Sequence, residues 1–336
     1  IDIIVEEKAT GEIMAGAGFG TNGASFIVGI KENNYLGKGI SIDTNLEVNE
    51  NSIKGILSIL NPNLKNSDNS GYLTIETSET DKLSLYGYKT NRTGFSFGTA
   101  FEYLDDLRIN LGNSNYFEKI ATNSTASALR TNQKGNYYDS FVKLDLNYDK
   151  RNQKYQTTSG FKSNYSLNLP VISKTNTVSN SYNFDIYKEL YTNNVTTFSF
   201  GFQNSKSLTG DNIKLSERLY IPSRKLRGFE TGKVGPKDGE DFIGGNYFSS
   251  FNMSSTLPQL FPNSESTDIV LFFDAANLWG VDYNSSLDDN KIRSSIGIGI
   301  DWWTPVGPLT FSFSEALSKS SSDVTESFRF NIGTTF

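Results

Sequence analysis

The chain has 336 residues and a formal net charge of −6 at pH 7, and it contains neither histidine nor cysteine. Histidine is the commonest general base and zinc ligand, so its absence argues against most hydrolases and metalloenzymes; we expect no enzyme, no metal site and no cofactor. The negative charge argues against a nucleic-acid partner, and the lack of cysteine fits an oxidising compartment. No apolar run approaches the roughly 20 residues of a transmembrane helix, so composition alone is compatible with a soluble β-protein.

Residues 1–9 differ from the rest of the chain. Ile1, Ile3 and Val5 form one short strand, and a charged segment at 6–8 follows it. This pattern is typical of the end of a preceding soluble domain that is linked to a larger one.

The first strand of the larger domain is predicted at 11–20 and is rich in glycine. Its glycines are Gly11, Gly16, Gly18 and Gly20. Glycine weakens a strand because it adds no packing and loses more conformational entropy on folding than other residues. The glycines therefore predict either a strand that separates easily from its neighbour, or one that needs curvature or tight packing.

From the second strand onwards, apolar and polar residues alternate with a period of two. The alternation is clear at 40–50 and recurs at 142–149, 198–203 and 295–302. Such a strand places one face against an apolar medium and the other against water. A β-sandwich would alternate in the same way. Many segments, however, have the roughly 9–11 residues that a tilted strand needs to cross a bilayer, and their polar faces carry charges as a wet lumen would.

Seventeen segments have strand character: 11–20, 24–32, 40–50, 52–60, 70–79, 82–90, 94–104, 107–117, 137–149, 160–169, 179–190, 195–204, 246–257, 267–276, 292–303, 309–317 and 326–336. Because single-chain bacterial barrels have an even number of strands, we interpret 82–90 as an extension of the loop after 70–79. The sequence therefore predicts an all-β fold, a sixteen-stranded antiparallel transmembrane β-barrel. Two long connections remain, a low-complexity loop at 118–136 and a loop at 205–245. A loop as long as the one at 205–245 is usually functional or disordered.

The loop at 205–245 contains a tripeptide that is unusual for a flexible segment, Arg227-Gly228-Phe229. Turn-forming residues follow it: Gly235, Pro236, Gly244, Gly245 and Asn246. Glycine permits the positive-φ turns that a confined loop needs. Taken alone, the arginine is also compatible with a surface cation beside a turn glycine.

Two late strands carry further candidates. In 267–276, Ile269, Leu271 and Phe273 share one apolar face, so Phe272 and Asp274 are predicted to face the lumen, where the aspartate is also compatible with a generic pore-wall charge. The last strand, 326–336, has a largely apolar face that Gly333 interrupts near its end. That face consists of Phe328, Phe330, Ile332, Thr334 and Phe336.

Several motifs together resemble the barrel domain of the BamA outer-membrane protein assembly factor family. The segment "KLRGFETGKVGPKDGEDFIGGNYF" resembles the family's sixth extracellular loop, and "LFFDAANLW", "DWWTPVGPLTFSFSEAL" and "FRFNIGTTF" resemble its final strands in order. Near the start, "EKATGEIMAGAGFGTNG", "NNYLGKG" and "NPNL" resemble its junction and first strands, and "DKRNQKYQTTSGF" resembles a mid-barrel turn. The resemblance covers nearly the whole chain and implies that residues 1–9 end a periplasmic POTRA domain and that 10–336 form the barrel.

The resemblance also implies a site inside the barrel. The loop at 205–245 folds back into the lumen, where Arg227 contacts Asp274 on the wall beside Phe272. A planar guanidinium can bind a carboxylate through two hydrogen bonds, which explains arginine over lysine. The family has a glutamate on the preceding strand at the position of Ser254, so this chain is expected to lack a second acid there.

The function implied is the insertion and folding of β-barrel proteins into the bacterial outer membrane through a lateral gate between the first and last strands. Expected partners are unfolded outer-membrane β-barrel clients, accessory lipoproteins and membrane lipid, but no nucleic acid. A related translocator, TamA-like or of the two-partner secretion type, and a passive porin remain alternatives. The expected gate residues are Gly11, Gly16, Gly18, Gly20, Phe330, Gly333 and Phe336.

Overall fold

The computed structural model describes residues 8–154, 156–192, 194–257, 266–304 and 307–333. Most of the segment expected to end a preceding domain, residues 1–7, lies outside the described residues, and so does Phe336. Within the described ranges, no helix is both long and apolar enough to span a membrane.

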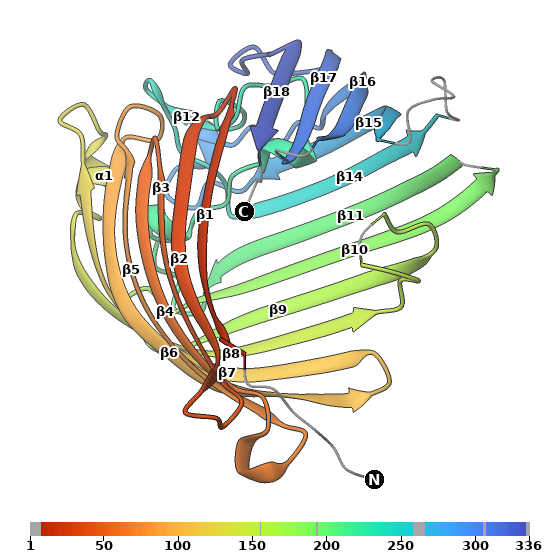
Figure 1. The fold of residues 1–336 in the computed structure, drawn as a ribbon. Coiled ribbons are helices and arrows are strands. Elements are labelled where there is room, and N and C mark those ends of the chain that lie inside the picture. The colour runs from red at the N-terminus through yellow and green to blue at the C-terminus, as the bar shows by residue number, and fades with distance from the viewer. Residues whose placement is uncertain (1–7, 155, 193, 258–265, 305–306, 334–336) are drawn as a thin grey trace, which may run out of the picture.

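Sixteen antiparallel strands close into one barrel, in which β18 pairs back onto β1 (Figure 1). The first eight are β1 Gly11–Gly20, β2 Gly23–Tyr35, β3 Ile40–Asn49, β4 Ser52–Asn61, β5 Ser70–Lys82, β6 Tyr88–Leu104, β7 Leu107–Thr122 and β8 Gly135–Asp149. The other eight are β9 Gly160–Ile172, β10 Thr177–Tyr191, β11 Asn194–Ser207, β14 Tyr247–Thr256, β15 Thr267–Trp279, β16 Arg293–Thr304, β17 Gly307–Ser318 and β18 Phe328–Gly333. The predicted all-β, sixteen-stranded antiparallel fold is therefore confirmed.

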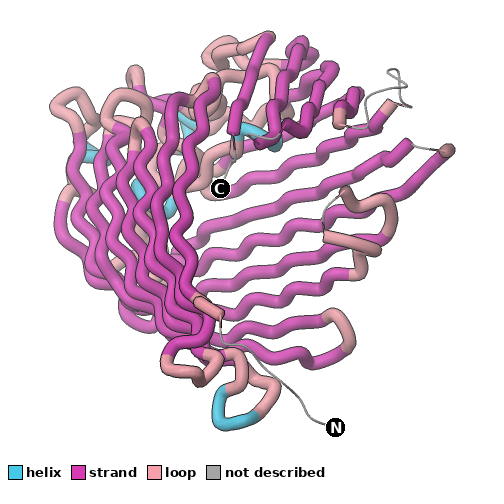
Figure 2. The backbone as a smooth tube through the Cα atoms, in the orientation of Figure 1, coloured by secondary structure: helices cyan, strands magenta, loops and turns pink. Residues whose placement is uncertain are grey.

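The remaining elements are short and lie in the connections. They are η1 Leu64–Asn66, α1 Ala128–Thr131, η2 Leu215–Glu217, η3 Ser223–Lys225, η4 Ser285–Leu287 and a separate two-stranded sheet of β12 Lys237–Asp238 and β13 Asp241–Phe242. The four longest connections on one side, 123–134, 208–246, 280–292 and 319–327, all lie at the barrel end opposite to the start of β1 (Figure 2).

The apolar face of the barrel strands is the exposed one. On β16, Ile296 and Ile298 are half exposed, whereas Ser295, which faces the lumen, is fully buried. On β15, Leu271 is exposed on the same outer side, and the neighbouring Phe272 and Asp274 are buried. This arrangement is the inverse of a soluble protein and is the one that a barrel surrounded by lipid requires.

Two predicted connections differ from the structure. The segment 82–90 is not a separate strand, as expected, but its loop is confined to 83–87 because Lys82 still belongs to β5 and Tyr88 begins β6. The predicted loop at 118–136 is too long. β7 continues to Thr122, and its Ile120 pairs with Gly135 at the start of β8, so only 123–134 form the connection.

The connection at 208–246, which we call the lumen loop, packs against the inner wall of the barrel and is slightly shifted from the predicted 205–245. Two apolar clusters hold it. The first joins Ile221, Leu226, Phe229 and Val234 of the loop to Phe248, Ala276 and Leu278 of β14 and β15. The second joins Leu215 and Phe242 of the loop to Tyr86, Tyr88, Ile120 and Tyr137 near the β5–β8 wall.

Candidate functional site

Arg227 and Asp274 form a bidentate ion pair inside the barrel. The Nε of Arg227 donates to Oδ2 of Asp274 at 2.7 Å, and Nη2 donates to Oδ1 at 2.8 Å. The backbone amide of Arg227 also donates to Oδ2, at 3.1 Å. The carboxylate of Asp274 is fully buried, and a buried charge is tolerated only when it is paired and hydrogen-bonded. The structure therefore brings together the loop cation and the wall acid that the sequence singled out.

The ring of Phe272 packs against the guanidinium of Arg227. The Cζ atom of Arg227 lies 3.4 Å from the ring centroid of Phe272, which places the cation over the face of the ring. The ring in turn lies over Gly297 of β16, where a Cβ atom would come within 2.5 Å of it. The wall of β15 and β16 is thus shaped to hold a flat aromatic ring with a flat cation above it.

Asn252 of β14 is a third member of the site, and the sequence analysis did not identify it. Its Nδ2 donates to Oδ1 of Asp274 at 2.8 Å and to the backbone carbonyl of Lys225 at 2.9 Å. Ser254, at the position of the family's glutamate, lies opposite Phe272 in the strand register. Asn252 faces inward, as Ser250 and Phe248 do on the same strand, and its amide therefore supports Asp274 in this chain.

Gly228 and Phe229 connect the ion pair to the end of the chain. Gly228 has φ +88°, and a Cβ there would lie 3.1 Å from the side chain of Ser295, whose hydroxyl donates to the carbonyl of Arg227 at 2.5 Å. The carbonyl of Gly228 accepts from the amide of Glu326 at 3.0 Å. Phe229 is buried and forms a β-bridge with Thr325, so the tripeptide is hydrogen-bonded to the connection that precedes β18.

The other predicted loop residues lie in the second half of the lumen loop, at 235–246, which we call the return limb. They do not meet Arg227. Gly235 donates to Oδ1 of Asp323 at 3.1 Å, and the carbonyl of Pro236 accepts from Ile243 at 3.0 Å. The last three connect this limb to its neighbours: Gly244 lies against Leu219 and Tyr220, Gly245 exchanges backbone hydrogen bonds with Leu219, and Asn246 donates to the carbonyl of Trp279.

The seam between β1 and β18 is short. β1 pairs with β2 along its whole length, but within the described residues it pairs with β18 only from Gly18 to Gly20. Gly333 pairs with Gly18, has φ +98°, and would place a Cβ 2.5 Å from the carbonyl oxygen of Ala17. The backbones of the two strands therefore approach closely at this point.

The predicted gate residues are distributed unevenly along this seam. Gly18, Gly20 and Gly333 lie in it, and Phe330 adjoins it, with its ring centroid 5.9 Å from that of Phe19. Gly11 and Gly16 pair with β2 and lie beyond the described β1–β18 pairs. Phe336 lies outside the described residues.

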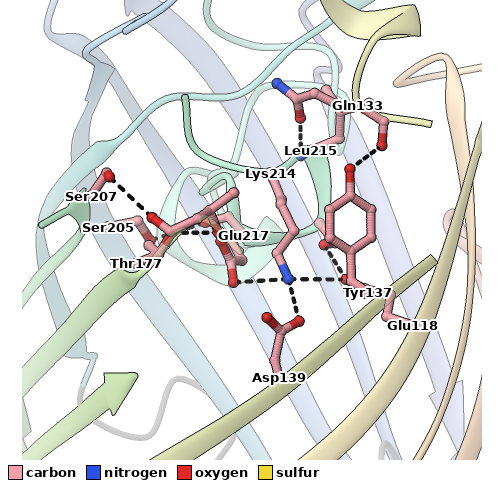
Figure 3. Close-up of polar contacts among 12 residues, drawn as sticks. Glu118, Gln133, Tyr137, Asp139, Thr177, Ser205, Ser207, Lys214, Leu215 and Glu217 are labelled. Carbon is pink, nitrogen blue, oxygen red and sulfur yellow. Dashed lines mark hydrogen bonds and ion pairs between the residues drawn. The ribbon is translucent and has the colours of Figure 1, made fainter. Parts of the chain in front are cut away.

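Lys214, whose side chain is buried, anchors the start of the lumen loop (Figure 3). Its Nζ donates to Asp139 of β8 and lies 3.5 Å from Oε2 of Glu118 on β7 and 3.2 Å from Oε1 of Glu217. The ring of Tyr137 lies on another side of the ammonium, with its centroid 5.0 Å from Nζ. We call these five residues the Lys214 cluster.

Hydrogen bonds around the Lys214 cluster hold the loop backbone in place. The hydroxyl of Ser216 donates to Oε2 of Glu118 at 2.8 Å, and the amide of Leu215 donates to Oε1 of Gln133 at 2.9 Å. Ser205 at the end of β11 donates to the carbonyl of Glu217 at 2.9 Å. Because this cluster fixes the loop to β7 and β8 whereas Arg227 fixes it to β15, the lumen loop spans the interior between distant parts of the wall.

Burial and neighbouring charges shift the pKa values of Lys214 and Glu217, the two ionisable loop residues of this cluster, in opposite directions. Burial lowers the pKa of Lys214, but Glu217, Glu118 and Asp139 raise it more, and the net pKa lies above the ordinary value. Burial raises the pKa of Glu217, and Lys214 only partly offsets this effect. The ammonium therefore stays charged, and Glu217 protonates more readily than an exposed glutamate does.

Comparisons with known proteins agree with this architecture. Residues 34–336 match the model of the Omp85 superfamily domain. The outer membrane protein assembly factor BamA of Neorickettsia risticii (strain Illinois) is 23% identical over 256 residues, which cover 74% of this chain and 34% of that protein. The chain thus spans about a third of that relative.

Solved structures share the fold. The crystal structure of BamA from Haemophilus ducreyi lacking POTRA domains 1–3 superposes with a TM-score of 0.91 at 24% identity and covers 98% of this chain and 71% of that one. CdiB from Acinetobacter baumannii covers 95% of this chain and 59% of its own, but with a TM-score of 0.56 at 11% identity. The barrel is therefore more similar in shape to that of the assembly factor.

Proposed function

The chain belongs to the Omp85 superfamily, and on that premise we propose that it inserts and folds β-barrel proteins into the bacterial outer membrane. The chain itself forms an outer-membrane barrel, with sixteen antiparallel strands and an apolar outer face. The curated relatives are named as assembly factors, which supports a function that is not enzymatic.

The observation that carries the proposal is the short seam between β1 and β18. The stretch from Gly11 to Ala17 pairs with β2, and none of its residues pairs with the described part of β18, which ends at Gly333. An unpaired strand edge is a template to which another strand can add through main-chain hydrogen bonds. We assign the seam as a lateral gate at which the edge of β1 receives a strand of the client.

The clients in this proposal are unfolded outer-membrane β-barrel proteins. Lipid offers no water to a strand's amide and carbonyl groups, so each strand that adds at β1 satisfies groups that would otherwise be unpaired. The folding of the client supplies the driving force, and the process requires no nucleotide or cofactor. Accessory lipoproteins and membrane lipid are the further partners that the family resemblance implies.

The lumen loop supports the gate from within in this account. The contacts of Arg227 with Asp274 and of Lys214 with Asp139 hold the loop across the interior. Through Gly228 and Phe229 the same loop reaches the connection before β18. We therefore assign Arg227, Gly228, Phe229, Phe272 and Asp274 a positioning role rather than a chemical one.

The two alternatives are less well supported. A related translocator would be favoured by similarity to CdiB, but that similarity is weaker than the one to the assembly factor. A passive porin is disfavoured because the lumen loop is packed across the interior with buried side chains such as Leu215 and Phe229.

A reversible lock across the seam tests the proposal. These 336 residues lack cysteine, and the side chains of Phe19 and Ile332 face each other across the seam, so Phe19→Cys with Ile332→Cys introduces one disulfide. A matched control links β1 to β2 through Ala15→Cys with Val28→Cys. In proteoliposomes, the full-length protein with an oxidised seam should insert no barrel client until it is reduced, whereas the control should insert in both states. Equal insertion by the oxidised and reduced seam pair would contradict the gate.

A further inference from the structure

Arg329 is an inward-facing residue of β18 that no step above uses. Its Nη1 donates to the carbonyl of Ser223 at 2.9 Å and its Nη2 to the carbonyl of Phe229 at 2.5 Å. Its Nε donates to Oε2 of Glu326 at 2.9 Å. One guanidinium thus joins the last strand to both ends of the loop segment 223–229, which contains Arg227.

Arginine is suited to this arrangement. Its planar fork presents several donors in fixed directions, so it can hold two carbonyls and a carboxylate at once, which the single ammonium of lysine cannot do with the same geometry. The side chain of Arg329 is 13% exposed, so water competes little for these acceptors. Hydrogen bonds from a charged donor are roughly twice as strong as neutral ones.

The backbone makes a second link between the same two parts of the molecule. The amide of Glu230 donates to the carbonyl of Val324 at 2.9 Å, and the amide of Val324 donates to the carbonyl of Lys233 at 3.0 Å. The loop segment is also fixed on its other side, because Arg227 binds Asp274 of β15. The segment therefore lies between the wall at β15 and the last strand, with charged contacts to both.

The strand that Arg329 holds is one side of the seam. Within the described residues, β18 pairs with β17 from Phe328 to Ile332, but pairs with β1 only through Asn331, Ile332 and Gly333. A shift of the loop segment would therefore pull on β18 at Arg329, only a few residues from the β1 pairs.

We propose that Arg329 is a positioning residue that transmits the position of the Arg227 segment to β18, and so sets how tightly the seam closes. The inference rests on the proposed gate and deepens it. The contact of Arg227 with Asp274 and the contacts of Arg329 then act as one unit, and breaking either releases the last strand. If Arg329 served only its local ion pair with Glu326, removing its guanidinium would affect the seam no more than removing the Glu326 carboxylate.

Seam closure can be measured without any client. In the full-length protein in liposomes, the disulfide between Phe19→Cys and Ile332→Cys forms at a rate that reports how often the strands are paired. Arg329→Gln should lower this rate about tenfold, because the released strand is paired less often once the charged hydrogen bonds are lost. Glu326→Gln, which removes only the local partner, should change it less than about twofold. The pair Ala15→Cys with Val28→Cys serves as the control for the rest of β1.

A double-mutant cycle separates coupling from general weakening. Arg227→Ala with Arg329→Gln should change the seam rate no more than the stronger of the two single variants, since both break the same connection. Independent, additive effects would overturn the proposal, and so would a wild-type rate in Arg329→Gln.

Heat-modifiable migration on gels verifies that each variant is a folded barrel. If Arg329→Gln does not fold, Arg329→Lys replaces it in the cycle, since it keeps the charge but not the fork, and the same outcomes apply. Failure of the wild-type protein to insert clients would contradict the proposed function, and it is a separate readout from the cross-linking rate.

Discussion

Asp274, which is fully buried in the barrel wall, accepts hydrogen bonds from both the guanidinium and the backbone amide of Arg227. A single carboxylate thus fixes the direction of the arginine side chain and the path of the loop backbone at the same residue. Asn252 fills one further acceptor position on Asp274 and also binds the carbonyl of Lys225. The contact is therefore a point at which the loop is attached to the wall, not only an attraction between two charges.

Arg227→Ala should release the lumen loop while leaving the barrel folded. Removal of one partner of a buried pair costs about 3–5 kcal/mol because the other charge, here Asp274, stays buried without compensation. Limited proteolysis should cut the loop of this variant much faster, and client insertion should fall. Asp274→Arg is expected to behave in the same way.

Lys233 supplies the matched control on the same loop. Its partner Glu230 is as exposed as Lys233 itself, and a pair at the surface contributes about 0–1 kcal/mol. The loop of Lys233→Ala should therefore be cleaved at the wild-type rate, and this variant should insert clients as well as the wild type does. Cleavage of Arg227→Ala at the wild-type rate would show that the buried pair does not hold the loop.

Lys214→Met should destabilise the other end of the loop. The substitution leaves Asp139 and Glu118 buried without their cation, and it should cost about 3–5 kcal/mol in the thermal unfolding of the loop and the β7–β8 wall. Adding Asp139→Asn should restore part of this loss, because the amide removes one of the unpaired charges. A double variant that is less stable than Lys214→Met alone would argue against the Lys214 cluster as an anchor.

The loop should also become more stable at mildly acidic pH through Glu217. Burial raises the pKa of this carboxyl in the folded protein, so the folded state binds a proton more readily than the unfolded state. The stability gained is absent well above the raised pKa, appears as the pH falls through it, and is complete below the ordinary value of 4.5. Comparison of wild type with Glu217→Gln by thermal unfolding across this range isolates the effect. Identical pH profiles would contradict it.

The alternation of apolar and polar residues was sufficient to predict most of the fold. Because a lipid-facing strand has a strict period of two, the sequence alone placed all sixteen barrel strands and oriented Phe272 and Asp274 inward. The ends of the strands were less predictable. β7 runs on to Thr122 through a mixed segment, 118–122, whose one large apolar residue, Ile120, is buried, so no lipid-facing pattern marks it as a strand.

The contacts of the lumen loop with the wall were only partly predictable. Arg227 stands out because it belongs to the Arg-Gly-Phe tripeptide, but Lys214 and Asp139 are separated by many residues and share no periodic pattern that would connect them. Asn252 is one of many asparagines, and only the register of β14 with β15 brings it to Asp274. Arg329 has the inward parity of β18, but its acceptors are backbone carbonyls, which the sequence does not distinguish.

Gly333→Ala should disturb the seam. The residue has a positive φ, and a Cβ would come within 2.5 Å of the carbonyl of Ala17, so the strands would have to separate. Gly39→Ala is the control because Gly39 also has a positive φ but no atom near the position of a Cβ. Both variants should lose about 1–3 kcal/mol from backbone strain, but only Gly333→Ala should change the cross-linking of Phe19→Cys with Ile332→Cys. The same cross-linking change in Gly39→Ala would mean that strain, and not the close approach, governs the seam.

The most direct test of the gate is to capture a client strand on β1 during assembly. Ile13 is 83% exposed on the outer face of β1, away from the described pairs with β18, so Ile13→Cys should form a disulfide with a cysteine in a client strand during insertion. Phe97→Cys on the outer face of β6, where both strand edges are paired, is the control. The account predicts a transient cross-link at Ile13→Cys that disappears when the client is released, and none at Phe97→Cys. Clients that fold at the normal rate without ever cross-linking to Ile13→Cys, or that cross-link equally at both positions, would contradict it.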